Sequence, residues 1–197
     1  MILLLAIITG LVAGVGRAKY GGHAYTVPKF QLGWLLIIAV IPQLFIFHLP
    51  VTSSIFSDNL AAIFLISSQI LLLIFVWENR KISGLWILGI GLLMNLEVIA
   101  LNGGFMPINL KTIHRLQPNA VIESSDIGNR MGSSKDELIV TSYTKLWFLS
   151  DRFVSPDWIP YRVAYSLGDI FIAIGVFWLL WTHGNIDATQ TGDLVSK

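Results

Sequence analysis

The segment from Leu96 to Leu110 reads LEVIALNGGFMPINL and ends the fourth long apolar run of the chain. It places a glutamate, Glu97, where a membrane-spanning helix usually carries apolar side chains. The sequence NGGFMP at 102–107 then ends the helix, because paired glycines favour left-handed backbone and a proline disfavours helical backbone at the residue before it. We interpret the stretch as the outer end of a helix, followed by a turn that folds the chain back over the membrane surface.

The composition is typical of a protein that lies in a lipid bilayer. Of 197 residues, 54% are hydrophobic and only 13% are charged, whereas soluble domains carry about 25% charged residues. A core of this size cannot bury so much apolar surface, so lipid must cover the remainder. The chain has no cysteine, which excludes disulfides, thiolate metal sites and a cysteine nucleophile, and its net charge of +1 gives no reason to expect nucleic acid binding.

Five apolar segments approach the ~17–25 residues that a spanning helix requires. They lie at 1–16, 32–49, 59–77, 84–101 and 163–181. The predicted fold class is an all-α membrane protein with about five transmembrane helices. A partly ordered outer cap, the extracytoplasmic loop 102–160, joins the fourth helix to the fifth. We expect residues 1–197 to form a single polytopic membrane domain.

The distribution of basic residues predicts the orientation. They gather in the first and third loops, at Arg17, Lys19, Lys29, Arg80 and Lys81, while the 50–58 loop carries only Asp58. Because Lys and Arg collect on the cytoplasmic side, the N-terminus and the outer loop are expected outside and the C-terminal tail inside. The first segment is also short enough for a cleavable signal peptide, but no positive charge precedes it, which favours an uncleaved anchor.

The outer loop contains three recognisable pieces. Residues 109–116 carry apolar side chains at helical spacing behind Asn109, which predicts a short, N-capped amphipathic helix. Residues 136–143 have the composition of a short extended segment, and the polar stretch 123–137 before them indicates a turn region. The aromatic segment 144–161, with Trp147, Trp158 and Tyr161, suits the headgroup layer just before the last helix.

Polar side chains occur within the apolar segments, at Gln43, Gln69, Asn95, Glu97 and Asp169. Two readings of the carboxylates Glu97 and Asp169 remain open, since both are expected at similar depth in the outer leaflet. In one, they form a proton or cation site that opens outward. In the other, which we favour, each carboxylate caps loop amides or pairs with an outer-loop base such as Lys111, Arg152 or Arg162. No inner-leaflet carboxylate continues a path across the bilayer.

Small residues at helical spacing predict where helices pack against one another. One stripe on the fourth helix comprises Gly84, Leu88, Gly91, Asn95, Val98 and Asn102. Glu97 lies about 200° round the helix from Asn95 and cannot share this seam. The last helix offers one face with Ala164, Gly168 and Gly175 and an adjacent one with Ser166, Asp169 and Ala173. Gly10 and Gly14 form a small-xxx-small pair in the first helix.

The sequence shows no pattern of a catalytic, metal or cofactor site, and we expect none of these. It lacks metal-ligand spacing, a phosphate-binding loop and a hydrolase serine elbow. His48 and His183 lie near opposite membrane faces, so they cannot ligate one haem together, although either is a candidate axial ligand for a chlorin. The Trp178 and Trp181 pair fits membrane anchoring best, with contact to a pigment or partner as the alternative.

Three motifs in order resemble one family. They are NGGFMP at 102–107, TKLWFLSDR at 144–152 with its Leu-x-Asp core, and YSLGDIFIAIGVFWLL at 165–180. Together they resemble a bacterial family of small polytopic membrane proteins that is catalogued only as a domain of unknown function. The resemblance implies membrane helices with an outer cap and implies no activity.

The motifs bring a set of polar and turn-forming residues to one membrane face. We predict that they form a polar knot that ties the cap to the fourth and fifth helices, because backbone groups freed at membrane depth need partners. The candidate structural site comprises Asn95, Glu97, Asn102, Gly103, Gly104, Met106, Pro107, Asp151, Arg152, Ser166, Gly168 and Asp169.

The expected function follows from these patterns. We expect a multi-pass protein of the bacterial inner (plasma) membrane without catalysis of its own, acting as an accessory or scaffold subunit of a larger membrane complex. Its expected partners are the lipid bilayer and other membrane protein subunits, with no nucleic acid. The alternative is a small transporter or proton-coupled carrier that uses Glu97 and Asp169. An enzyme ranks third, since no nucleophile–base set is visible.

Overall fold

The computed structural model describes residues 2–47, 56–119, 122, 126–130, 134–156, 159 and 162–183. Several expectations from the sequence fall outside these residues. They concern His48, residues 50–55 of the loop between the second and third apolar segments, Trp158, Tyr161 and the C-terminal tail beyond His183.

The described residues are mostly helical, with six α-helices. They are α1 (Ile2–Tyr20), α2 (Trp34–Phe47), α4 (Asp58–Glu78), α5 (Leu85–Leu101), α6 (Leu110–Leu116) and α7 (Leu167–Thr182). By length and composition, α1 and α4 are able to cross a membrane, while α2, α5 and α7 are shorter apolar helices. These five apolar helices coincide with the five predicted segments to within a few residues, which confirms the helical part of the expected fold class.

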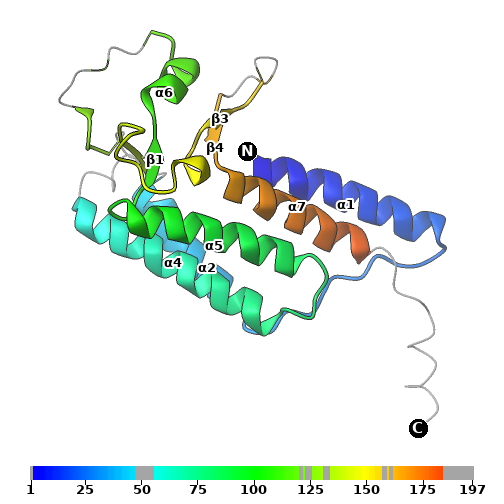
Figure 1. Cartoon of the computed structure of the whole chain (residues 1–197). Coiled ribbons are helices and arrows are strands. Elements are labelled where there is room, and N and C mark those ends of the chain that lie inside the picture. Colours follow the sequence, from blue (N-terminus) through cyan, green and yellow to red (C-terminus); the bar gives the residue numbers. More distant parts are fainter. Residues whose placement is uncertain are drawn as a thin grey trace.

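The five apolar helices lie side by side in a row, in the order α2, α4, α5, α7 and α1 (Figure 1). The most extensive contacts join α7 to both α5 and α1, and α4 to both α2 and α5. An apolar core runs through the row, with Leu35, Phe75, Leu85, Leu92 and Leu179 contributed by four of the helices. The helices α1 and α2 therefore form the two edges of this layer.

The last helix begins later than the sequence predicted. Residues Ala164–Tyr165 form a short strand, β4, and Ser166 caps α7, which starts at Leu167. Asp169 consequently lies in the first turn of α7. Ala164 is also wrongly assigned to the small-residue face of this helix, since it lies outside the helix.

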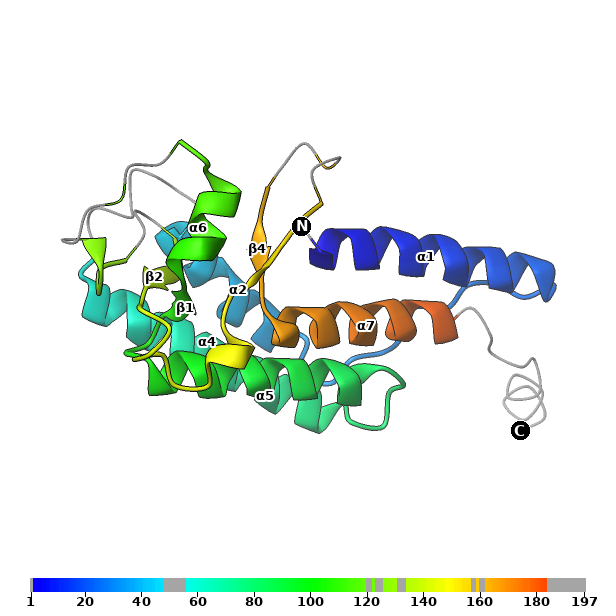
Figure 2. The same cartoon turned by 45° about the horizontal axis from the view of Figure 1, so that its top comes forward.

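A small cap lies at one end of the row (Figures 1 and 2). Its central strand β1 (Met106–Ile108) pairs in parallel with β2 (Asp136–Leu138), with Pro107 opposite Glu137. On the other side of β1, Ile108 forms a bridge with Asp151. A second pair joins β3 (Phe153–Val154) to β4 in antiparallel register, and a 3-10 turn, η2 (Trp147–Leu149), packs against α5 and α7.

The short helix predicted at 109–116 is confirmed as α6. The side-chain oxygen of Asn109 accepts a hydrogen bond from the Thr112 amide at 2.9 Å, so Asn109 is the N-cap. Ile113 is buried on the face that meets Ile108 and Leu138. The extended segment expected at 136–143 is confirmed only over 136–138, because a turn follows in which the Val140 carbonyl accepts from the amides of Tyr143 and Thr144.

The turn after α5 has the left-handed backbone that its glycines predict. Gly103 and Gly104 have φ angles of +87° and +98°. The Gly104 amide donates to the Ile99 carbonyl at 2.9 Å, which closes the helix end. A Cβ atom at Gly104 would also collide with the Cβ of Ala62 on α4. The turn therefore requires glycine both for its backbone angles and for close packing against α4.

The end of the row opposite the cap carries the predicted basic residues. The C-terminal ends of α1, α4 and α7 lie there, together with the start of α5 (Figure 1). The guanidinium of Arg17 stacks over Trp181, and that of Arg80 stacks over Trp77, each 4.8 Å from the ring centre. Trp178 donates to the Ser83 hydroxyl at 3.0 Å. Basic and aromatic side chains thus meet at this end.

Candidate functional site

The seam between α5 and α7 is built from glycines, in the place where the sequence predicted it. A Cβ atom at Gly91 would lie 2.5 Å from the Gly168 carbonyl oxygen, and one at Gly84 would lie 2.5 Å from that of Gly175. Such distances leave no room for a side chain, so the two backbones are in direct contact. Gly10 and Gly14 bring α1 equally close to α7, against Phe177 and Leu180.

A buried polar cluster joins α5 and α7 near the cap. The Asn95 amide nitrogen donates to the Asp169 carboxylate at 2.9 Å, and the Asn95 oxygen accepts from the Ser166 hydroxyl at 2.9 Å. Ser166 and Asp169 also form a capping box, in which each side chain accepts from the backbone amide of the other at 3.0 and 3.1 Å. Asn95 is 4% exposed and Ser166 is fully buried, so these bonds hold the two helices together away from water.

Asn102 ties the end of α5 to the cap. Its amide nitrogen donates to the carbonyls of Val98 and Lys145 at 2.7 and 2.9 Å, and its oxygen accepts from the Lys145 amide at 2.9 Å. One buried side chain thereby satisfies the backbone of two segments 43 residues apart. This is the role that the polar knot hypothesis assigned to Asn102.

Asp151 lies beside β1, with its side chain 1% exposed. Its amide donates to the Pro107 carbonyl at 3.0 Å, and its carboxylate pairs with the ammonium of Lys135 at 3.4 Å. On the opposite side of β1, the Met106 amide donates to the Lys135 carbonyl at 2.9 Å. Lys135 and Asp151 therefore flank the central strand of the cap and connect across it.

Burial dominates the electrostatics of Asp151. It raises the pKa of the carboxyl from 3.8 to about 7, against the opposing effect of Lys135 and with a further increase from the nearby Asp136. One oxygen of each of these two carboxyl groups is buried without a hydrogen-bond partner among the described residues. Asp151 thus lies where a proton is readily held.

The structure does not bring Glu97 and Asp169 together. Glu97 is exposed on the face of α5 that turns away from the Asn95 seam, and no hydrogen bond or ion pair joins it to another described residue. The bases predicted to pair with these carboxylates lie elsewhere. Arg152 stacks over Trp147 and Phe153, and Arg162 donates to the Arg115 carbonyl at 2.9 Å.

Two basic residues of the site were missed in the sequence. Lys135 lies in a polar stretch that reads as solvated, and its partner Asp151 is 16 residues away. Arg130 comes from the same stretch, yet its side chain is 8% exposed, pairs with Asp58 at 3.3 Å and lies beside the rings of Phe47 and Phe105. A charged residue within a polar loop gives no local signal of an ion pair or of burial, because its partners come from distant segments.

The arrangement is that of a structural lock. The Ser166 hydroxyl donates to the Asn95 amide oxygen, and an amide oxygen is not a general base. Among the described residues, no group of three or more His, Asp or Glu side chains is arranged to hold a metal ion. The polar atoms of Asn95, Ser166 and Asn102 are instead bonded to each other and to backbone.

The comparisons with known proteins place this chain in a family. Residues 28–181 match the sequence profile described as "Family of unknown function (DUF5317)". This range includes Asn95, Asn102, Asp151, Ser166 and Asp169 and excludes α1. No curated protein and no solved structure matches the chain. The resemblance inferred from the three motifs is confirmed: the chain belongs to DUF5317, a family of unknown function.

Proposed function

We propose that the five apolar helices cross the bacterial inner membrane, with the cap outside and the basic end in the cytoplasm. Apolar side chains remain exposed along every one of these helices, for example Val12 (68%), Ile37 (59%), Ile63 (58%), Leu93 (47%) and Ile174 (46%). Water disfavours so much exposed apolar surface, whereas lipid covers it. The basic end supports this orientation, because Lys and Arg are retained on the cytoplasmic side.

The absence of cysteine makes this topology easy to test. A single cysteine introduced as Thr141→Cys lies in the cap, and one introduced as Lys81→Cys lies at the basic end; both positions are exposed. An impermeant maleimide applied to intact spheroplasts is expected to label the first and not the second, while lysis exposes both. Labelling of Lys81→Cys before lysis, or protection of Thr141→Cys, would contradict the orientation.

We further propose that the protein is a non-catalytic accessory or scaffold subunit of a larger membrane complex. The observation that carries this proposal is the open row of helices. The edge helix α1 buries only small residues, at Ala6, Gly10, Gly14 and Ala18, and leaves many of its large apolar side chains exposed. A row with two open edges suits lateral contact with other membrane helices.

Site-specific cross-linking tests the subunit role. A photo-reactive phenylalanine placed at Val12 on α1 or at Ile41 on α2 samples the two edges of the row; both side chains are exposed. The same group at Tyr143, which is 81% exposed in the cap, serves as the control. A discrete protein adduct from an edge position supports the proposal. Adducts with lipid alone at both edges would count against it.

The second candidate is a proton-coupled carrier that uses Glu97 and Asp169. One observation favours it: the Gln43 amide donates to the Ser68 hydroxyl near the middle of α2 and α4, and the adjacent Gln69 oxygen is buried without a partner among the described residues. Proteoliposomes with an internal pH dye test this candidate. Proton flux that stops in Glu97→Gln supports the carrier, and flux no greater than in empty liposomes excludes it.

A further inference from the structure

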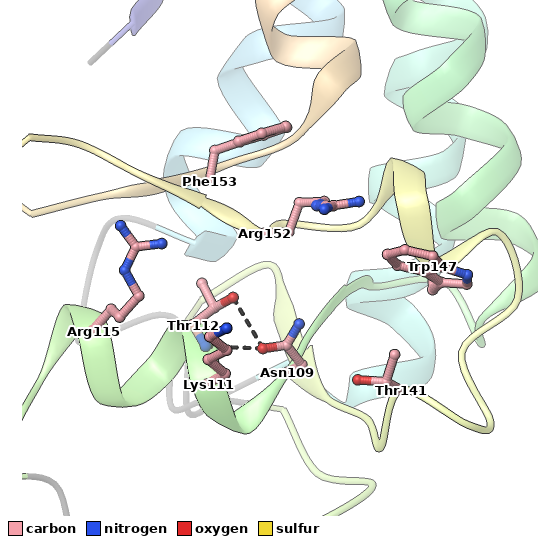
Figure 3. A pocket seen from close by; sticks show the side chains of 8 residues that line it. All are labelled: Asn109, Lys111, Thr112, Arg115, Thr141, Trp147, Arg152 and Phe153. Carbon is pink, nitrogen blue, oxygen red and sulfur yellow. Dashed lines mark hydrogen bonds between the residues drawn. The ribbon is translucent and has the colours of Figure 1, made fainter.

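A second feature of the cap is a pocket of about 380 Å³ between α6 and the segment that leads into β3 (Figure 3). Its lining consists of Asn109, Lys111, Thr112, Arg115, Thr141, Trp147, Arg152 and Phe153. It is separate from the Asn95–Asp169 cluster, none of whose residues line it. Figure 3 shows α6 on one side of the pocket and Trp147, Arg152 and Phe153 on the other.

The charge of this lining has a single sign. Three of the eight residues, Lys111, Arg115 and Arg152, are basic, and none is acidic. Lys111 and Arg115 lie four residues apart on α6, a spacing at which like charges repel. No ion pair joins any of the three to a carboxylate among the described residues. An anion in the pocket would relieve this repulsion.

Arg152 is held in place by the rings beside it. Its guanidinium carbon lies 4.9 Å from the centre of the Trp147 ring and 5.4 Å from that of Phe153. Stacking of this kind restricts the long side chain before any ligand arrives and leaves the planar donor groups available at its edge. Planar, pre-oriented guanidinium groups favour carboxylate and phosphate oxygens.

A neutral donor completes the set. The Asn109 oxygen accepts from both the amide and the hydroxyl of Thr112, at 2.9 and 3.0 Å. This fixes the orientation of the Asn109 side chain, since only the oxygen can accept these bonds. Its amide nitrogen therefore faces the pocket side, toward Arg152 in Figure 3, with no recorded acceptor among the described residues.

We propose that this pocket binds a phosphate group, with Arg152, Lys111 and Arg115 as the cations and the Asn109 amide as a further donor. Trp147 and Phe148 are half exposed at the same edge of the cap, at 50% and 47%. An apolar, aromatic rim beside a basic pocket favours the headgroup of an anionic phospholipid over a free phosphate compound. The lipid source rests on the proposed membrane topology, whereas the phosphate site does not.

Thermal unfolding of the full chain in neutral detergent tests the proposal, because a ligand that binds the folded state raises the midpoint with its concentration. The probes are dioctanoyl phosphatidylglycerol, inorganic phosphate and, as the zwitterionic comparison, dioctanoyl phosphatidylcholine. The test variant combines Lys111→Gln with Arg115→Gln, and Arg152→Gln is a second. The control combines Lys19→Gln with Lys81→Gln, which removes two exposed charges at the opposite end of the row.

Phosphatidylglycerol is expected to raise the midpoint in the wild type and the control, and to bind about tenfold more weakly in either test variant, since each loses charge-assisted hydrogen bonds. A response to the lipid alone identifies a headgroup site, and one to inorganic phosphate identifies a site for soluble phosphate compounds. An equal response to phosphatidylcholine, no response to any probe, or an equal loss in the Lys19 and Lys81 control would overturn the proposal. The unliganded midpoint of each variant shows whether it folds.

Discussion

The side-chain amide of Asn95 on α5 donates a hydrogen bond to the carboxylate of Asp169 on α7 at 2.9 Å, and the two residues are 74 positions apart in the chain. This bond joins a helix interior to a helix N-terminus. The Asp169 carboxylate therefore serves two purposes at once, since it caps α7 through the Ser166 amide and fastens α7 to α5.

Replacing Asn95 by alanine is expected to destabilise the fold. The change removes the acceptor of the buried Ser166 hydroxyl and the donor to one Asp169 oxygen, at a cost of about 1–3 kcal/mol. Thermal unfolding in mild detergent measures the loss. Glu97→Ala, two residues away on the exposed face of the same helix, is the control and should stay within about 0.5 kcal/mol of the wild type. Equal effects of the two changes would show that the cluster is not stabilising.

Two glycines of α1 provide a matched pair for the α1–α7 contact. A Cβ atom at Gly14 would meet the Leu180 carbonyl and the Tyr25 ring, whereas one at Gly16 meets nothing within 4 Å. Gly14→Ala is expected to lower the unfolding midpoint. Gly16→Ala should leave it unchanged or raise it, because alanine is favoured over glycine in a helix by roughly 0.5–1 kcal/mol. The opposite ranking would contradict the close packing of α1 on α7.

Substitution of Gly104 in the turn after α5 should be more damaging than substitution of Gly103. Both glycines have positive φ angles, but only Gly104 packs directly against Ala62, while the space at Gly103 is open apart from a Glu137 oxygen 3.7 Å away. Gly103→Val is expected to lower the folded yield in detergent through backbone strain, and Gly104→Val to lower it further through strain and collision. Fluorescence-detected size exclusion reports the yield. A Gly104→Val variant with wild-type yield would refute the packing argument.

Protonation of Asp151 should make the stability of the folded protein fall as the pH rises. Because burial raises its pKa to about 7 in the folded state, from 3.8, the folded protein holds a proton that the unfolded chain releases between these values. The stability that this proton contributes is present at low pH and is lost as pH rises from about 4 to 7.

The comparison with Asp151→Asn isolates this effect. Unfolding midpoints of wild type and variant, measured across pH 4 to 8, should show the wild type losing stability relative to the variant as pH rises. The slope of the difference is the informative quantity, since the variant also deprives Lys135 of its partner. A difference that does not change with pH would mean that Asp151 is ionised throughout.

The sequence predicts the helices and the local turns of this fold well. Runs of apolar residues identify the five apolar helices. The Gly103-Gly104 turn and the Asn109 cap are predictable because each depends on residues next to it in the sequence. The start of α7 was misplaced although a signal for it was present. The spacing Ser166-x-x-Asp169 is that of a capping box, but the apolar residues before it were assigned to the helix.

The parallel pairing of β1 with β2 and the ion pair between Lys135 and Asp151 were not predictable in this way. The paired strands lie about 30 residues apart in the chain, and Lys135 lies 16 residues from Asp151. The sequence around each segment does not indicate which distant segment it contacts. Charged residues in a polar stretch, such as Lys135 and Arg130, appear solvated until the surrounding fold is known.

The separation of Asn95 from its partners also orders events during biosynthesis. When Asn95 is added to the growing chain, Ser166 and Asp169 are still 71 and 74 residues from being added. At translation rates of ~5–20 residues per second, this interval lasts roughly 4–15 s. Until α7 is made, Gly84, Gly91 and the Asn95 amide of α5 lack the partners that they contact in the folded chain.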